Sequence, residues 1–398
     1  MCFCKVKIKY LLLLLVVFPI WSCIDPYNVD VSNSENLLVV EALITDETKS
    51  HEVKLSRSIS NIGEMPNPEE NATVTILCDN GNEEVLQEKA PGVYKTDSIK
   101  FKAVVGKSYK LKIKTENGDV YESNECEMLE PSKIDRLYYK KGTTIDVNNK
   151  EVEGIQFYVD GESSVDSYVR WLYEEDWKFS ITHPQYIDFD ENKELIYIPV
   201  ENFYCWKNSI SNEIIVQSLE NQNSTSIDGK KVCFIPSGIN DKFNIKYSIL
   251  IKQLSISKEE YNYWNKLKES TEDVGDIFGS QPYSTEGNIK NITNSKETVL
   301  GYFQTGAVTS KRIFITWEDA AEIGLKDVIV IPYCHQDTVD VDNNYFHNLY
   351  DIYEYYVLNG DFRIHDKPME RDALIIVEPT CVDCSLTGSL KKPKFWED

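Results

Sequence analysis

The sequence lacks the common signatures of an enzyme. Its 398 residues contain no H-E-x-x-H zinc motif, no G-x-S-x-G nucleophile elbow and no glycine-rich phosphate loop. Histidine is scarce, and no two of the five histidines have the spacing of metal ligands: His51, His183, His335, His347 and His365. We therefore expect no catalytic residues, no bound metal and no cofactor.

Positive charge is also scarce. The chain has 42 Lys and Arg residues against 65 Asp and Glu residues, a formal net charge of −23. Such a surface repels the phosphate backbone, so the composition excludes a nucleic-acid partner. An acidic surface attracts cations or basic peptides, but solubility is the simpler interpretation of the charge.

Long apolar runs are rare, and the clearest one lies near the first residue. The run from Leu11 to Ile20 is about half of the roughly 20 residues that a transmembrane helix needs. Three lysines precede it and Ser22-Cys23 follows it, which is the layout of a bacterial lipoprotein signal peptide. We predict that residues 1–22 are removed and that Cys23 carries the lipid; an ordinary secretory signal is the alternative.

Ten cysteines are present, of which Cys2 and Cys4 fall in the predicted signal peptide. Besides Cys23, seven are available for possible disulfides: Cys78, Cys126, Cys205, Cys233, Cys334, Cys381 and Cys384. Because seven is odd, at least one thiol stays free or pairs between chains. Cys78 with Cys126, and Cys205 with Cys233, are plausible pairs, although connectivity cannot be deduced from sequence.

Cys381 and Cys384 form a C-x-x-C motif near the last residues of the chain. Redox activity in such a motif depends on a helix N-terminus that lowers a thiol pKa, and no helical pattern follows here. A metal site needs more soft ligands, for which Cys334 and His335 are the obvious candidates. We therefore favour structural disulfides that hold the C-terminal tail.

The hydrophobic pattern predicts a mainly β protein. Residues 23–36 are polar and form a predicted tether. Short alternating segments separated by turns, such as Ser108–Thr115, predict an immunoglobulin-like β-sandwich over residues 37–130. Longer strand-like segments predict a larger β-rich domain over residues 131–398, with one or two short helices.

Two segments have helical spacing. Ser257 and Glu260 form a capping-box pattern that predicts a helix over residues 257–269. Its Tyr261 and Trp264 share one face, which we expect to cover the β core. A second helix is predicted from about Asn343 to Leu358, with a strand as the alternative.

Aromatic residues make up 12% of the chain. The densest stretch lies between Glu151 and Phe179 and contains Tyr158, Tyr168, Trp171, Tyr173 and Trp177. These side chains are candidate recognition aromatics for a ligand, whereas alternation along a buried strand is the simpler explanation.

Two aspartate-rich fragments resemble the start of a calcium loop. In Asp340-x-Asp342-x-Asn344, Tyr345 replaces the required glycine and no glutamate closes the loop. The second fragment is Asp188-x-Asp190-x-Asn192. Both are more typical of polar turns.

Several short sequence phrases together resemble a known family. C-I-D-P-Y begins at Cys23, L-V-V-E-A-L-I-T-D spans 38–46, Y-S-I-L-I-K-Q spans 247–253 and C-V-D-C spans 381–384. The combination is similar to the Bacteroidota lipoprotein family DUF4249, over nearly the whole chain after Cys23. The resemblance implies an outer-membrane lipoprotein, often encoded beside a TonB-dependent receptor, and it supplies no catalytic residues.

Together these features predict a non-enzymatic accessory lipoprotein, held in the outer-membrane lipid through Cys23. We expect it to bind a peptide or glycan ligand, or a TonB-dependent receptor, in nutrient uptake. A position on the cell surface is favoured over the periplasmic face. The alternatives are a structural or adhesive surface module and, less favoured, a hydrolase with an unrecognised site.

Overall fold

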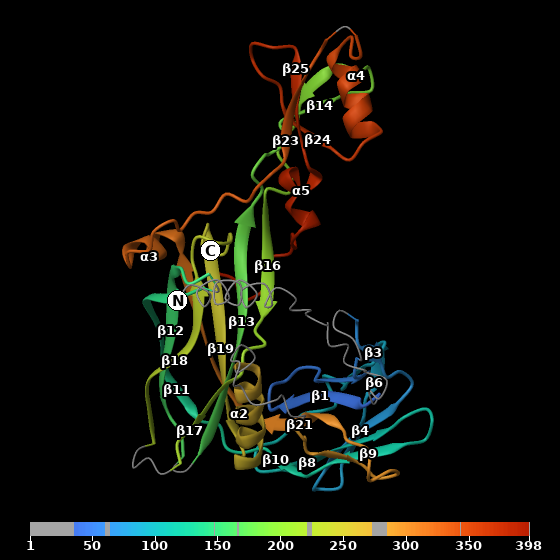
Figure 1. Cartoon of the computed structure of the whole chain (residues 1–398), viewed down its shortest axis with the longest axis vertical. Coiled ribbons are helices and arrows are strands. Elements are labelled where there is room, and N and C mark those ends of the chain that lie inside the picture. Colours follow the sequence, from blue (N-terminus) through green and yellow to red (C-terminus); the bar gives the residue numbers. More distant parts are fainter. Residues whose placement is uncertain are drawn as a thin grey trace, which may run out of the picture.

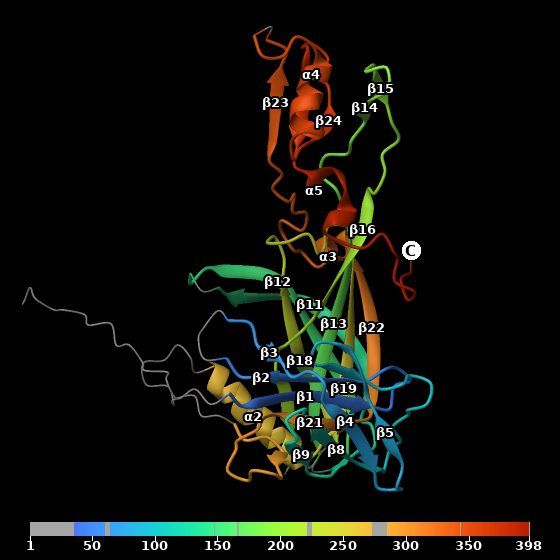
Figure 2. The same cartoon turned by 90° about the vertical axis from the view of Figure 1, so that its right-hand side faces the viewer.

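The computed structural model describes residues 36–59, 64–146, 148–164, 167–220, 225–272, 285–342 and 344–397. This part of the chain is elongated, with a β-sandwich at one end, a tall β body in the middle and a smaller lobe at the other end (Figures 1 and 2). Most described elements are strands and the helices are short, so the prediction of a mainly β fold is confirmed.

The sandwich consists of two sheets. The first has the order β21 (Leu300–Gly306), β1 (Leu38–Thr45), β2 (Glu52–Arg57), β7 (Val93–Lys95), β6 (Gln87–Ala90), with β3 (Asn67–Pro68) also on β2. The second has the order β20 (Ile289–Asn291), β9 (Val120–Ser123), β8 (Ser108–Lys114), β4 (Thr73–Cys78), β5 (Glu83–Val85), with β10 (Cys126–Glu127) also on β8. Alternating residues of both sheets, including Val40 and Leu111, form one buried core.

Two strands of the sandwich come from a distant part of the chain. β20 and β21 lie in residues 289–306, outside the range 37–130 that the pattern predicts for this domain. β21 runs parallel to β1, with Gly301 opposite Val40. Gly301 has a φ of +91°, and a Cβ there would lie 1.9 Å from the Val40 carbonyl oxygen. Local alternation cannot show which sheet such a short strand joins, because the pairing is made over more than 200 residues of chain.

The body consists of two further sheets that share a core. One contains β11 (Lys133–Ile145), β12 (Glu151–Glu162) and β18 (Ser226–Pro236). The other has the order β16 (Tyr204–Ile210), β13 (Tyr168–Ser180), β19 (Lys246–Ile256), β22 (Val308–Thr316), with β17 (Ile215–Ser218) also on β13. Phe157 of the first sheet packs with Trp171 and Ile249 of the second in the largest buried cluster.

Helix α2 (Lys258–Glu272) confirms the helix predicted over 257–269. The Ser257 hydroxyl accepts a hydrogen bond from the backbone N–H of Glu260 at 3.1 Å, as a capping residue does. Tyr261 and Trp264 pack against Leu254 and neighbouring core residues, as predicted. A shorter helix, α3 (Trp317–Glu322), follows β22. No helix among the described residues is long and apolar enough to cross a membrane.

The lobe at the far end, which we call the distal lobe, joins two segments of the chain. A hairpin of β14 (Ile187–Phe189) and β15 (Leu195–Tyr197) packs with a C-terminal sheet. That sheet has the order β23 (Gln336–Asp340), β25 (Ala373–Val377), β24 (Arg363–Asp366), with helices α4 (Leu349–Tyr353), η1 (Glu354–Leu358), α5 (Pro379–Val382) and η2 (Cys384–Leu386).

The helix predicted from about Asn343 begins later, at Leu349. The Asp342 carboxylate accepts hydrogen bonds from the backbone N–H groups of Asn344, Tyr345 and Phe346, which forms a turn at that point. Asn348 then caps the helix by accepting the N–H of Asp351 at 3.1 Å. Asn343 itself lies outside the described residues.

Candidate functional site on the distal lobe

The expected recognition aromatics do not form a surface. Tyr168, Trp171, Tyr173 and Trp177 are buried on β13. β13 pairs with strands on both edges. Trp171, Tyr173 and Trp177 belong to the core of the body, and Tyr168 belongs to the smaller cluster beside α2. The hypothesis that these four residues bind a ligand is therefore wrong, and the alternative of a buried strand holds.

The polar groups of these aromatics are satisfied inside the protein. Trp171 and Trp177 donate their indole N–H groups to Gln253 at 2.8 Å and to Asp241 at 2.9 Å. The remaining candidate, Tyr158, is half-buried and stacks on Tyr138 with ring centres 5.3 Å apart.

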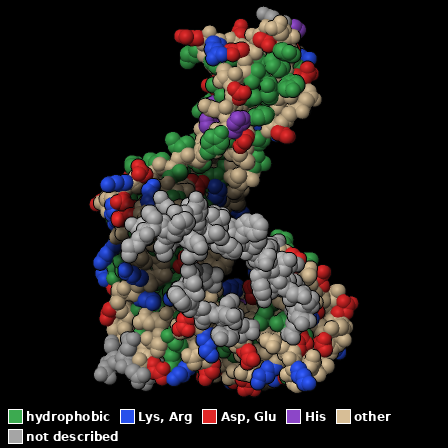
Figure 3. All heavy atoms as spheres, in the orientation of Figure 1, with side chains coloured by type: hydrophobic (Ala, Val, Ile, Leu, Met, Phe, Trp, Pro, Cys, Tyr) green, Lys and Arg blue, Asp and Glu red, His purple; other side chains and the backbone are tan. Residues whose placement is uncertain are grey.

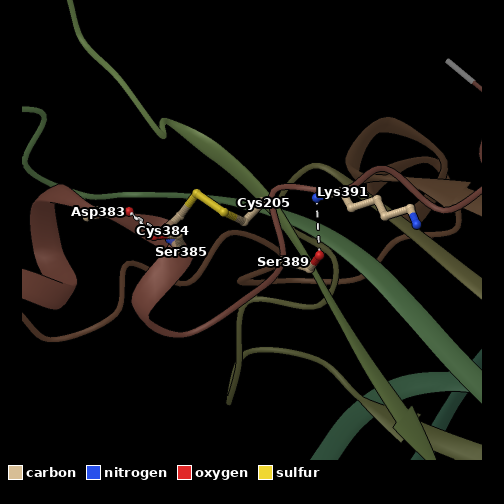
Figure 4. The surroundings of a disulfide bond; sticks show 6 residues. All are labelled: Cys205, Asp383, Cys384, Ser385, Ser389 and Lys391. Carbon is tan, nitrogen blue, oxygen red and sulfur yellow. Dashed lines mark hydrogen bonds between the residues drawn. A yellow bond between two sulfur atoms is a disulfide. The ribbon is translucent and has the colours of Figure 1, made fainter.

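Two disulfides attach the C-terminal segment to the rest of the protein. Cys205 of β16 pairs with Cys384, 179 residues later, as Figure 4 shows. Cys334 pairs with Cys381 inside the lobe. The two cysteines of the C-x-x-C motif therefore take different partners, and the prediction that they hold the C-terminal tail is confirmed.

Neither of the two pairings suggested from sequence forms. Cys78 and Cys126 both lie opposite Tyr109, on the two strands that flank β8. Two strand spacings separate them, about 9.6 Å, which is too far for a disulfide. Cys205 bonds to Cys384 instead of Cys233, which is buried in the other body sheet. Cys78, Cys126 and Cys233 remain free thiols.

Histidines and cysteines meet at the base of the distal lobe. His183, in the loop before β14, lies beside the Cys334–Cys381 disulfide, and the three possible ligand atoms are all within 4.8 Å of one another. His365 of β24 packs edge-on against His183, with ring centres 5.0 Å apart. Burial, and then the charge of His365, lower the pKa of His183 below its ordinary value. Histidine side chains are visible in this region in Figure 3.

Above this base, aromatic side chains gather around α4 and η1. We call Tyr345, Phe346, Tyr350, Tyr355 and Tyr356 the lobe aromatic surface. Tyr345 is 83% exposed and Tyr355 is 62% exposed, while the other three are half-buried. Phe346 contacts the rings of Tyr355 and Tyr356 at centre distances of 5.7 and 6.0 Å. Figure 3 shows hydrophobic side chains gathered in this part of the lobe.

The aspartate-rich fragments are turns, as the sequence favoured. The Asp190 carboxylate accepts the backbone N–H groups of Asn192 and Glu194 in the β14–β15 hairpin. Asp340 forms an ion pair with Arg371. The carboxylates of Asp190 and Asp340 thus form hydrogen bonds and an ion pair with other residues of the lobe.

Sequence reasoning did not find the cluster at the base of the lobe. His183 and His365 are separated by 182 residues, and only the fold of the lobe brings them together. The one usable signal in the sequence was Cys334, a candidate metal ligand together with the adjacent His335. In the structure, the histidine grouped with Cys334 is His183. Cys23 lies outside the described residues.

The fold and this site define a class: a β-rich protein of several sheets whose C-terminal lobe is braced by disulfides and carries exposed tyrosines. The chain belongs to the family described as "Domain of unknown function (DUF4249)", which it matches over residues 24–312. The family predicted from short phrases is thereby confirmed over residues 24–312, a range that does not include the C-V-D-C phrase at 381–384. No significant match was found among curated proteins.

Proposed function

We propose that this protein is a non-enzymatic accessory lipoprotein of the outer membrane that binds a TonB-dependent receptor through the lobe aromatic surface. The observation that carries the proposal is the exposure of Tyr345 and Tyr355 on one short segment of the lobe, where Tyr355 packs against the rings of Phe346 and Tyr356. The resemblance of the sequence to outer-membrane lipoproteins supplies the expected partner and the role in nutrient uptake.

Exposed tyrosines in a cluster favour a protein interface. Tyrosine is enriched at interfaces because its ring buries a large apolar area at low cost in side-chain entropy, while its hydroxyl keeps a polar contact. Tyr355 packs edge-on against Tyr356, with ring centres 4.9 Å apart, so its position is already restricted before binding. Less conformational freedom is then lost when a partner covers it.

The position of the surface on the molecule agrees with this role. The first described strand, β1, belongs to the sandwich, and the distal lobe lies at the opposite end (Figures 1 and 2). A lipid on Cys23 would hold the sandwich end near the bilayer. The lobe is then the part free to reach a neighbouring protein.

The experiment compares the wild-type protein with Tyr345→Ala/Tyr355→Ala. Both side chains are mostly exposed, so the double substitution leaves the lobe core intact. Trp317→Ala is the matched control, because Trp317 is an exposed aromatic outside the lobe, 42% exposed at the start of α3. Each protein is purified from gently solubilised outer membranes, and co-purifying receptors are quantified by mass spectrometry.

We expect a TonB-dependent receptor to co-purify with wild type and with Trp317→Ala, and its recovery to fall at least about tenfold with the double variant, as expected for loss of hot-spot residues. Equal recovery with all three proteins would show that the lobe aromatic surface is not the binding site. Absence of any receptor, together with normal nutrient uptake and loss of attachment in a deletion strain, would favour an adhesive module instead.

A further inference from the structure

We propose that His183, Cys334 and Cys381 form a binding site for a thiophilic divalent ion such as Zn²⁺, which becomes available when the Cys334–Cys381 disulfide is reduced. This site is distinct from the lobe aromatic surface and does not depend on the receptor-binding proposal. The three residues come from three separate segments of the chain, which converge at the base of the distal lobe.

The three donor atoms are close enough to share one ion. All lie within 4.8 Å of one another. In a tetrahedral zinc site, bond lengths of about 2.3 Å to sulfur and 2.0–2.1 Å to nitrogen place the ligand atoms roughly 3.5–3.8 Å apart. Opening the disulfide allows the two sulfurs to separate to that distance by side-chain rotation. Two thiolates and one imidazole leave a fourth position for water or a group of a bound partner.

The surroundings hold the histidine in place. The backbone N–H of His183 donates to the Cys381 carbonyl at 3.1 Å. This hydrogen bond holds the backbones of the two residues together, so their side chains stay close. The Nδ1 atom of His183 lies 2.9 Å from the Thr182 hydroxyl. Hydrogen bonds of this kind orient the ligating imidazoles of metal sites.

His365 supports the ring of His183 from the side. Its Nδ1 lies 2.6 Å from the Pro184 carbonyl oxygen, which only accepts, so Nδ1 carries the proton and donates. This fixes the tautomer of His365 and keeps it edge-on against His183. We assign His365 a positioning role.

The chemical step that opens the site is thiol–disulfide exchange with a dithiol reductant. The Cys334–Cys381 bond breaks, each sulfur gains one proton, and the dithiol is oxidised to its own disulfide, so two electrons and two protons reach the protein. The ion then displaces both thiol protons, which pass to water as two sulfur–metal bonds form. The ion would keep the same two segments of the lobe connected after the covalent bond is lost.

The second disulfide provides a matched control inside the same protein. Cys205–Cys384 also anchors the C-terminal segment, yet neither of its cysteines belongs to the group of three potential metal ligands found among the described residues, which is His183, Cys334 and Cys381. A variant that loses Cys205 and Cys384 therefore keeps the proposed site, and a variant that loses Cys334 and Cys381 removes it. The free thiols Cys78, Cys126 and Cys233 are common to all variants, so their contribution cancels.

The test titrates the full chain with Co²⁺ after reduction by a phosphine, and records the cobalt–thiolate charge-transfer absorption. Competition with Zn²⁺ then gives the zinc affinity. We expect reduced wild type and Cys205→Ser/Cys384→Ser to bind one ion with thiolate absorption and to release two protons per ion near pH 7. Oxidised wild type and Cys334→Ser/Cys381→Ser should show no such absorption.

His183→Ala keeps all four disulfide cysteines and is reduced in the same way as wild type, so it tests the site without a cysteine substitution. Loss of a direct ligand should weaken binding at least about tenfold, since even the loss of a hydrogen-bonding partner of a ligand costs that much. The proposal is overturned if reduced wild type binds no more tightly than Cys334→Ser/Cys381→Ser. It is also overturned if His183→Ala binds as well as wild type, or if oxidised and reduced proteins bind equally.

Discussion

The guanidinium carbon of Arg170 lies 3.7 Å from the centre of the Trp264 ring, so a buried cation–π contact joins β13 to α2. Arg170 also donates to Gln304 of β21, which belongs to the sandwich. Glu260, one turn before Trp264 on α2, accepts the indole N–H of Trp264 at 3.4 Å. These contacts connect the body, α2 and the sandwich through one buried polar cluster.

This cluster predicts a pH-dependent stability. Burial raises the pKa of Glu260 to about 7, against a partial lowering by Arg170. The folded protein therefore binds this proton more tightly than the unfolded chain does, and the stabilisation is full below pH 4.5 and is lost as the pH rises to about 7. Relative to Glu260→Gln, which carries no charge, wild type should lose stability over that range.

The measurement is urea unfolding at several pH values from 4.5 to 8. Glu259→Gln is the control, because Glu259 is exposed and precedes Glu260 on the same helix. The free energy of unfolding of Glu259→Gln, plotted against pH, should run parallel to that of wild type. Parallel curves for wild type and Glu260→Gln would contradict the prediction.

Gly301 provides a second prediction, about the strand that completes the sandwich. Gly301→Ala places a methyl group against the Val40 carbonyl in addition to requiring a positive φ. Gly324 has a similar φ of +83° with nothing within 4 Å of its Cβ position, so Gly324→Ala is the matched control for backbone strain alone. We expect Gly301→Ala to lower the free energy of unfolding by more than about 1 kcal/mol and by more than the control. The opposite result in calorimetry is that Gly301→Ala and Gly324→Ala lose the same free energy of unfolding. That result would show that β21 shifts away from β1 without further loss of stability.

The Cys205–Cys384 disulfide predicts how firmly the C-terminal segment is held. It closes a loop of 179 residues, and loss of such a bond typically costs about 2–5 kcal/mol. We expect Cys205→Ala/Cys384→Ala to be cleaved by protease near residues 383–397 much faster than wild type. The sandwich, which contains neither residue, should remain intact as an internal control. Cleavage at the wild-type rate would mean that the surrounding contacts, including the Trp206 bridge to Ser389, hold the segment without the bond.

The proposed lipid attachment at Cys23 predicts the behaviour of a variant in cells. If Cys23 carries the lipid, Cys23→Ala should lack it and be recovered in the soluble fraction, because the proposed anchor would supply the membrane affinity. Fractionation and mass measurement of the mature chain provide the readout. A Cys23→Ala protein that still sediments with outer membranes would remove lipidation as the reason for membrane attachment.

Local patterns predicted some elements and not others. The S-x-x-E pattern at Ser257 located α2 because N-capping acts within one turn of chain: the Ser257 hydroxyl accepts the backbone N–H of Glu260. Alternation predicted β8, whose Tyr109, Leu111 and Ile113 are buried. The aromatic stretch on β13 was ambiguous, because a buried strand can contain the same aromatic residues as a binding surface. Whether these aromatic side chains are buried or exposed depended on which other elements pack against β13.

By itself, the sequence determined the mainly β character of the protein, the capped helix and the surplus of thiols over pairs, since these follow from short-range pattern and from counting. Tertiary structure decided the partners of Cys381 and Cys384, the return of residues 289–306 to the sandwich, and the meeting of His183 with Cys334. The physical reason is that each of these contacts joins residues far apart in the chain. Burial and strand pairing across the whole fold choose such partners, and no local pattern records that choice.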